Sequence, residues 1–76
     1  MSRLNEPTKL KAGVYLARCK EATFLKAGIN GHSSVWPEAD LTIRDGWAYF
    51  SKSGVEVWNC NSAYASLHFI VSPVAS

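Results

Sequence analysis

Two turns that contain glycine divide residues 41–61 into three short runs of strand-forming residues. The runs are Leu-Thr-Ile-Arg at 41–44, Trp-Ala-Tyr-Phe-Ser at 47–51 and Val-Glu-Val-Trp-Asn-Cys at 55–60, separated by Asp45-Gly46 and by Ser-Lys-Ser-Gly at 51–54. β-Branched and aromatic residues are enriched in strands, and short loops of this composition are strong hairpin signals. The pattern predicts three consecutive antiparallel strands.

The flanking residues predict two more strands. Residues 63–71 alternate apolar and mixed side chains, which is typical of a strand with one buried face. Residues 13–19 are rich in strand formers, although residues 17–28 can also form a short helix, around 20–27, that Gly28 closes. The sequence leaves that choice open. Residues 27–34 predict a loop, and Pro37 restricts its neighbours to a sheet edge or to a segment leading into a strand.

These elements predict an all-β fold, mainly an antiparallel meander. A short, twisted sheet usually rolls up, so we expect a small SH3-like or OB-like barrel or half-barrel, with one short helix around residues 20–27 as an optional element. An open sheet with one short helix on its face is the alternative. Because 76 residues rarely form two cores, residues 13–76 are expected to form one small β domain, preceded by a flexible lead-in at 1–12.

The hairpin register decides which rings are buried, because a slip of one residue moves every side chain to the other face. Two-residue turns predict an aliphatic core of Leu41, Ile43, Ala48, Phe50, Val55 and Val57. Three-residue turns instead bury Trp47 and Tyr49 and expose Ala48 and Phe50. Serine at the first and glycine at the fourth position of residues 51–54 favour the three-residue turns. Both registers place Trp58 beside Glu56, away from Val55 and Val57.

At least two large rings therefore lie outside the predicted core. An aromatic side chain buries roughly 150–250 Å², so at about 25 cal/mol per Å² two bare rings leave several kcal/mol of burial unused. Either residues 13–27 and the N-terminal arm cover them, or a partner does. Interfaces are enriched in tryptophan, tyrosine and arginine. The predicted partner-binding residues are Arg44, Trp47, Tyr49, Phe50 and Trp58.

The partner is expected to be another protein or a second copy of the chain, because the last strand can lie at a sheet edge and carries no lysine to block pairing. Single-stranded nucleic acid is the alternative, since bases stack on aromatic rings in a positive groove. The residues predicted for that role are Arg18, Lys20, Lys26, Arg44, Trp47, Tyr49 and Trp58. A net charge of +2 is small for a protein that must neutralise phosphates.

Chemistry-bearing motifs do not stand out in the sequence. It holds no phosphate-binding glycine loop, no metal-ligand spacing and no nucleophile elbow. Pairs such as Cys19 with His32 or Cys60 with His68 are the minimal nucleophilic arrangement, but any small domain offers such pairs. We expect two separate thiols, with a Cys19–Cys60 bridge as the alternative, and no enzyme activity, metal, cofactor or small-molecule substrate.

The sequence shows no secretory signal and no stretch of about 20 apolar residues that could cross a bilayer. A cytoplasmic protein is therefore expected. Taken together, these features predict a non-enzymatic protein-interaction module, such as a small accessory or inhibitory protein of a phage or mobile element. The alternative is a small barrel that binds single-stranded nucleic acid on the same rings.

Overall fold

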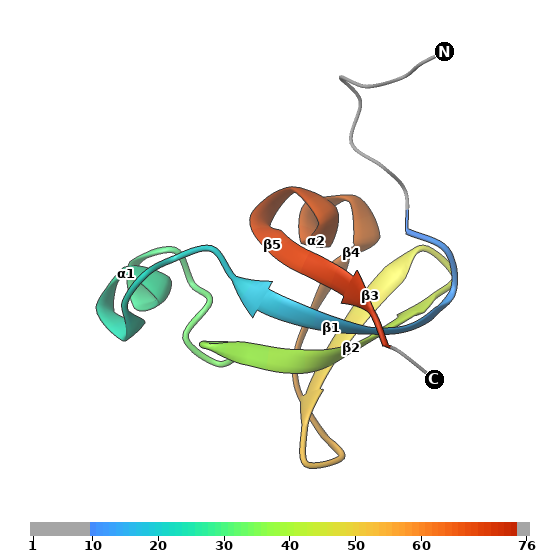
Figure 1. The fold of residues 1–76 in the computed structure, drawn as a ribbon, viewed down its shortest axis with the longest axis horizontal. Helices are drawn as coiled ribbons and strands as arrows, with labels where there is room; N and C mark the ends of the chain where they lie inside the picture. The colour runs from blue at the N-terminus through green and yellow to red at the C-terminus, as the bar shows by residue number, and fades with distance from the viewer. Residues whose placement is uncertain (1–9, 75–76) are drawn as a thin grey trace.

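The computed structural model describes residues 10–74, which form an open five-stranded antiparallel sheet with two short helices (Figure 1). Most of the predicted lead-in at 1–12 lies outside the described residues. The strands are β1 (Gly13–Cys19), β2 (Glu38–Arg44), β3 (Trp47–Lys52), β4 (Val55–Asn61) and β5 (Phe69–Pro73), and the helices are α1 (Phe24–Ile29) and α2 (Ser62–His68).

The strands lie in the order β4-β3-β2-β1-β5, so the predicted, mainly antiparallel sheet is confirmed. Two hairpins join β2, β3 and β4, while β5 returns to pair with β1 at the other end of the order. In the part of the chain that the structure describes, β4 and β5 are the two edges and do not pair with each other to close a barrel.

Both hairpins have two-residue turns. Asp45 and Gly46 have φ angles of 55° and 78°, and Ser53 and Gly54 have φ angles of 52° and 81°. Positive φ at both central residues defines the type I′ turn, whose twist matches that of the flanking strands. The three-residue turns that the sequence favoured are therefore wrong, and Ile43 lies opposite Ala48 as the two-residue alternative predicts.

A bulge between β3 and β4 changes the faces of the second hairpin. Ser51 pairs with Glu56 but Phe50 pairs with Trp58, so Val57 is an extra residue on β4. Beyond the bulge, Trp58 points to the same side as Phe50 and packs against the core. The expectation that Trp58 lies away from the core in either register is wrong. Val55, which both registers placed in the core, is exposed.

Residues 63–68, predicted as part of the last strand, form helix α2 instead. Asn61 caps this helix by accepting a hydrogen bond from the Ala63 backbone N–H at 2.7 Å, and alanine favours the helix. Ser62 and Ala65 lie three apart and are buried, so the segment satisfies a helical period as well as a strand period. The strand prediction holds from Phe69, where β5 begins.

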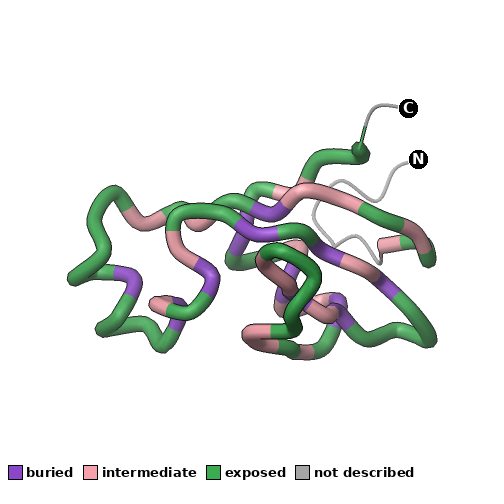
Figure 2. Tube along the Cα trace, turned by 90° about the horizontal axis from the view of Figure 1, so that it is seen from below, coloured by how far each residue is buried: buried purple, intermediate pink, exposed green. Residues whose placement is uncertain are grey.

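The core lies between the inner face of the sheet and helix α2. Figure 2 shows buried positions alternating with exposed ones along the central strands. The fully buried larger side chains of this core include Leu41, Phe50 and Phe69. The opposite side of the sheet, which we call the outer face, carries Thr42, Arg44, Trp47 and Tyr49 at the β2–β3 hairpin.

The connection from β1 to β2, residues 20–37, forms a projection that we call the α1 lobe (Figure 1). It contains the predicted short helix, which runs over Phe24–Ile29, slightly later than expected. Thr23 caps the helix by accepting a hydrogen bond from the Lys26 backbone N–H at 3.2 Å. Strand β2 begins directly after Pro37, so this proline precedes the sheet rather than interrupting it.

Candidate functional site

Three of the predicted partner-binding residues, Arg44, Trp47 and Tyr49, lie together on the outer face. Arg44 pairs with Trp47 across β2 and β3, and the Arg44 guanidinium carbon lies 4.6 Å from the centre of the Tyr49 ring. A cation over an aromatic face stabilises such a contact by about 0.5–1 kcal/mol at an exposed site. We call these three side chains the outer ring array.

Contacts to β4 hold the indole of the outer ring array in place. Trp47 Nε1–H donates a hydrogen bond to Asn59 Oδ1 at 3.0 Å, and Asn59 Nδ2 donates in turn to Glu56 Oε2 at 2.9 Å. The Trp47 side chain nevertheless remains 39% exposed. A ring that is already fixed loses little conformational entropy when a partner covers it.

The other two predicted partner-binding residues, Phe50 and Trp58, do not join the array. Phe50 is fully buried on the inner side of the sheet. Trp58 is half-buried there, with its ring 5.3 Å from Phe50 and 5.8 Å from Phe69 between centres. Both rings belong to the core rather than to the outer face.

The charges on the outer face are mixed. Arg44 is accompanied by Arg18 near the other end of β2, where Arg18 Nε lies 3.8 Å from Glu38 Oε1. Asp40 and Glu56 add two more carboxylates. A groove that follows a phosphate backbone needs a run of cations, whereas the strand positions of the outer face intersperse Arg18 and Arg44 with the carboxylates of Glu38, Asp40 and Glu56.

The two lysines of the predicted nucleic-acid site lie far from the outer ring array along the sheet. Lys20 and Lys26 belong to the α1 lobe, which follows β1 at the end where Arg18 pairs with Glu38. Lys20 Nζ donates a hydrogen bond to the Leu67 backbone oxygen at 2.7 Å. The structure therefore does not bring Lys20 and Lys26 beside Arg44.

A polar network centred on the buried His32 joins the α1 lobe to α2. We call it the buried polar network, and its other members are the partly buried Glu21 and Tyr64 and the exposed Asn30. His32 is 2% exposed, and its Nδ1 lies 2.9 Å from Glu21 Oε2 while its Nε2 lies 2.7 Å from the Tyr64 hydroxyl. Asn30 Nδ2 donates to the same Glu21 oxygen at 2.7 Å. Sequence reasoning placed His32 in a loop and did not predict this network, because Tyr64 is 32 residues away in the chain.

The network sets the ionisation of its acidic members. Burial by itself would raise the pKa of Glu21, but hydrogen bonds from Asn30, from the Glu21 backbone and from His32 outweigh burial and lower that pKa. Burial raises the pKa of Tyr64, and nearby Cys60 and Glu21 raise it further. A tyrosine hydroxyl can donate or accept, so both ring nitrogens of His32 have partners.

The contact between Cys19 and His32 does not form a nucleophilic dyad. Cys19 Sγ lies 4.0 Å from the His32 backbone oxygen, and the ring nitrogens bond elsewhere. Burial, reinforced by the charge of Glu21, raises the pKa of the Cys19 thiol to about 11. Since the thiolate is the reactive form, this thiol is not activated.

The other predicted pair is also not joined. Among residues 10–74, no hydrogen bond connects Cys60 to His68, and the His68 ring stacks on Tyr64 with centres 4.1 Å apart. Burial raises the pKa of Cys60 to about 11. Both cysteines are free thiols.

Residues 10–74 hold neither a metal-binding cluster nor a membrane-spanning helix. Within this range, histidine, cysteine, aspartate and glutamate side chains do not gather in a group of three that could hold a metal ion. Neither helix of the same range combines the length and the apolar character needed to cross a membrane.

Helix α1 exposes its large apolar side chains. Phe24, Leu25 and Ile29 are 59%, 74% and 77% exposed, whereas Ala27 is fully buried. Phe24 packs edge-on against Trp36 with ring centres 5.9 Å apart. The sequence left this helix as one of two alternatives and gave no prediction of its orientation, because the buried polar network that orients it depends on distant residues.

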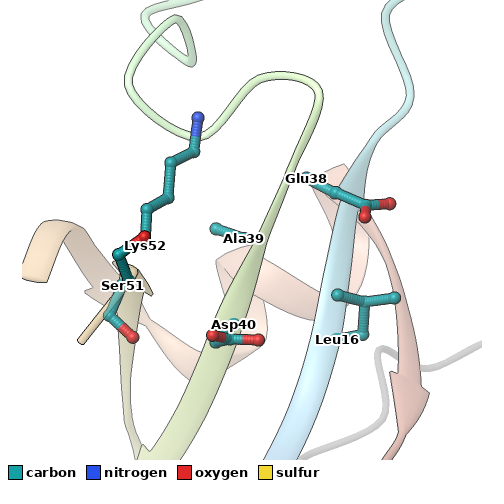
Figure 3. A pocket seen from close by; sticks show the side chains of 7 residues that line it. Leu16, Glu38, Ala39, Asp40, Ser51 and Lys52 are labelled. Atoms are coloured by element: carbon teal, nitrogen blue, oxygen red, sulfur yellow. The ribbon is translucent and has the colours of Figure 1, made fainter. Parts of the chain in front are cut away.

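A shallow hollow of about 190 Å³ lies near the α1 lobe (Figure 3). Neighbouring strands supply its lining, with Leu16 from β1, Asp40 from β2 and Ser51 from β3. The remaining lining residues are Glu38, Ala39, Lys52 and Ser53.

The chain matches no protein-family model, and the comparisons with curated proteins and with solved structures likewise found no similar protein.

Proposed function

We propose that this chain is a protein-interaction module that holds a protein partner on the outer ring array. The observation that supports this proposal is the fixed geometry of the exposed rings, with Arg44 against Tyr49 at 4.6 Å and Trp47 bonded to Asn59 at 3.0 Å. Tryptophan, tyrosine and arginine are the residues that most often dominate binding energy at protein interfaces.

The surroundings of the array suit a protein interface. Trp47 and Tyr49 form an aromatic centre, and Asn59 and Glu56 beside them supply hydrogen-bonding groups at its border. An apolar centre with a polar rim is the usual anatomy of such a contact. For a module of this kind we propose a cytoplasmic, non-enzymatic accessory or inhibitory role.

Single-stranded nucleic acid is the second candidate, because Trp47 and Tyr49 with Arg44 could also stack bases. Its phosphates would lie close to Glu56 and, further along the face, to Asp40. The carboxylates oppose the electrostatic attraction that supplies most non-specific affinity. The charge of the outer face therefore favours a protein over a nucleic acid.

We also propose how the sheet curves. We favour an SH3-like half-barrel, supported by the strand order β4-β3-β2-β1-β5 and by the position of α2 between the two edge strands. In such a half-barrel, the inner face is filled by the core and the outer face at the β2–β3 hairpin stays open to a partner.

The test compares matched variants in an affinity capture from the cells that make the protein. The double variant Trp47→Ala, Tyr49→Ala removes the rings, and Val55→Ala is the control because Val55 is exposed at the other turn. We expect one protein to be retained by the wild type and by the Val55→Ala control and lost from the double variant. Retention of the same protein by all three would contradict the proposal.

A parallel titration addresses the second candidate. The wild type is titrated with a mixed-sequence single-stranded oligonucleotide at about 50 and 200 mM salt, a range over which phosphate contacts weaken sharply, while tryptophan fluorescence is followed. We expect no saturable change at either salt concentration. Saturable quenching that fades at the higher salt would replace the protein partner by a nucleic acid.

A further inference from the structure

The exposed apolar residues of α1 form a ridge, which we call the α1 ridge: Phe24, Leu25 and Ile29. Leu25 and Ile29 are four residues apart, so they lie side by side along one face of the helix. At 74% and 77% exposure, they are among the most exposed large apolar side chains of residues 10–74. Contiguous apolar surface of this kind commonly marks an interaction site.

The outward orientation of the α1 ridge is built into the fold. Ala27 is the buried residue of the helix, and its backbone oxygen accepts a hydrogen bond from the His32 N–H at 2.7 Å. His32 is in turn fixed by Glu21 and Tyr64. The buried polar network therefore holds the helix with its small side chain inward and its large side chains outward.

The α1 ridge and the hollow are linked through Trp36. Phe24 of the ridge packs against Trp36, and the Trp36 backbone oxygen accepts a hydrogen bond from Lys52 Nζ at 2.7 Å. Lys52 itself lines the hollow, and Figure 3 shows its side chain extending from the hollow toward the loop that precedes β2. When one chain carries both a projection and a recess, a two-fold axis can place the projection of each copy in the recess of the other.

The charges that have no partner in the two features are opposite. In the α1 lobe, Lys20 Nζ bonds to the Leu67 oxygen and the Glu21 carboxylate bonds to His32, which leaves the Lys26 ammonium without a partner among residues 10–74. In the hollow, Glu38 pairs with Arg18 and Lys52 Nζ bonds to the Trp36 oxygen, which leaves the Asp40 carboxylate as the corresponding group next to the apolar side chain of Leu16. At about 190 Å³ the hollow is smaller than the roughly 300–1,000 Å³ of small-molecule sites, and its size suits a protein side chain.

We propose that two copies of the chain associate about a two-fold axis, each placing its α1 ridge against the hollow of the other. Leu25 and Ile29 then lie against Leu16, and Lys26 lies against Asp40 of the second copy. Such an isologous contact is the commonest form of homodimer. Because the contact occurs twice, the dimer buries twice the area that one short ridge can bury. A specific interface requires a total buried area of about 1,200 Å² or more.

This dimer uses a part of the outer face next to the outer ring array. Ser51 of the hollow and Tyr49 of the array are two residues apart on β3, roughly 7 Å at about 3.3 Å per residue, but the lining of the hollow does not include Arg44, Trp47 or Tyr49. The inference therefore goes beyond the proposed function and does not depend on those three side chains. The double variant Trp47→Ala, Tyr49→Ala is expected to remain dimeric.

The first test is sedimentation velocity on the full chain between about 1 μM and 1 mM at low salt, where opposite charges attract most strongly. The wild type is expected to change from monomer to dimer over this range. Leu25→Asp is expected to weaken the association at least about tenfold, because it buries an unpaired charge. Val74→Asp, which adds the same charge at an exposed valine just after β5, on the far side of β1 from β2, is the matched control and leaves the association unchanged.

A charge exchange tests the pairing itself. Lys26 and Asp40 are both exposed, and neither side chain has a hydrogen bond or ion pair within residues 10–74, so their exchange should leave folding intact, as far-UV circular dichroism can verify. Lys26→Glu alone and Asp40→Lys alone are expected to weaken the dimer, and both changes in one chain to restore it.

Three results would overturn the inference. They are a wild type that stays monomeric to 1 mM, a dimer that Leu25→Asp leaves intact, and an exchanged double variant no more dimeric than the single ones. Loss of the proposed protein partner in the capture experiment, with the dimer retained, would overturn the proposed function and leave the dimer standing.

Discussion

Phe50 and Trp58 lie opposite each other on β3 and β4 with ring centres 5.3 Å apart, because Val57 is the extra residue of a bulge. Without the bulge, Val57 would face Phe50 and the indole would point to the outer face. One inserted residue therefore decides that Trp58 belongs to the core while Trp47 remains available at the surface.

The two tryptophans should respond differently to truncation. Trp58→Ala removes a ring that contacts Phe50 and Phe69, and is expected to lower the free energy of unfolding by about 3 kcal/mol. Trp47→Ala is expected to lower it by less than about 1 kcal/mol, because the ring is partly exposed. Urea unfolding followed by circular dichroism measures both, and equal losses would contradict the bulged register.

One substitution in the turn at residues 53–54 is expected to stabilise the protein. Ser53 has a φ angle of 52°, in the left-handed region that asparagine adopts more readily than serine. Ser53→Asn is therefore expected to raise the free energy of unfolding by about 0.5 kcal/mol, since Asn-Gly is the preferred pair of a type I′ turn. Ser53→Val, with a β-branched side chain at the same φ, is expected to lower it by about 1 kcal/mol or more. An unchanged midpoint in both variants would contradict the two-residue turn.

The buried polar network predicts acid sensitivity. The pKa of Glu21 is lower in the folded than in the unfolded chain, so its contribution is present above about pH 4.5 and is lost as the pH falls through the lowered pKa. Glu21→Gln is expected to reduce the free energy of unfolding by about 1.5–3 kcal/mol at pH 6 and to flatten its dependence on pH below 4.5. Urea unfolding of both proteins at pH 6 and at pH 3 measures this, and an equal difference at the two pH values would contradict it.

The thiols should react slowly in the folded protein. Burial raises the pKa of Cys19 and of Cys60 from 9.0 to about 11, which lowers the thiolate fraction at pH 8 by about 100-fold. Iodoacetamide labelling read by mass spectrometry is expected to be slower by about that factor than labelling in urea. The same shift makes folding favour the protonated thiols, so this contribution is present below pH 9 and is lost as the pH rises through about 11. Labelling at equal rates would contradict the burial of the thiols.

Local signals predicted much of the sheet. Asp45-Gly46 marked its hairpin correctly, and the runs of strand formers gave β1, β2, β3 and β4 close to their observed bounds. The short helix near residue 24 was one of the two alternatives, strand or helix, that its residues left open. These features depend on neighbours in sequence, which is why one chain suffices to predict them.

Other features depend on distant contacts. No residue type in the sequence marks the bulge at Val57. The bulge shows itself only in the packing of Trp58 with Phe50 and Phe69. The alternation in residues 63–68 fits a strand and a helix equally, and the capping by Asn61 and the burial of Ala65 accompany the helix.

The outer ring array was predicted in part for the same reason. Arg44, Trp47 and Tyr49 share a face in the two-residue register, which follows from the alternation along β2 and β3. Phe50 and Trp58 were assigned to the same surface because the prediction favoured the wrong register and did not include the bulge. The orientation of α1 required knowledge of the contact between His32 and Tyr64.

The most direct test of the outer ring array is a photo-crosslink inside the cells that make the protein. The exposed Trp47 is replaced with p-benzoylphenylalanine in one sample, and Val55, exposed at the other turn, is replaced in the matched control. The account predicts that irradiation joins position 47, but not position 55, to one other protein, giving a band that nuclease leaves unchanged. A nuclease-sensitive adduct at position 47, or the same adducts at both positions, would contradict it.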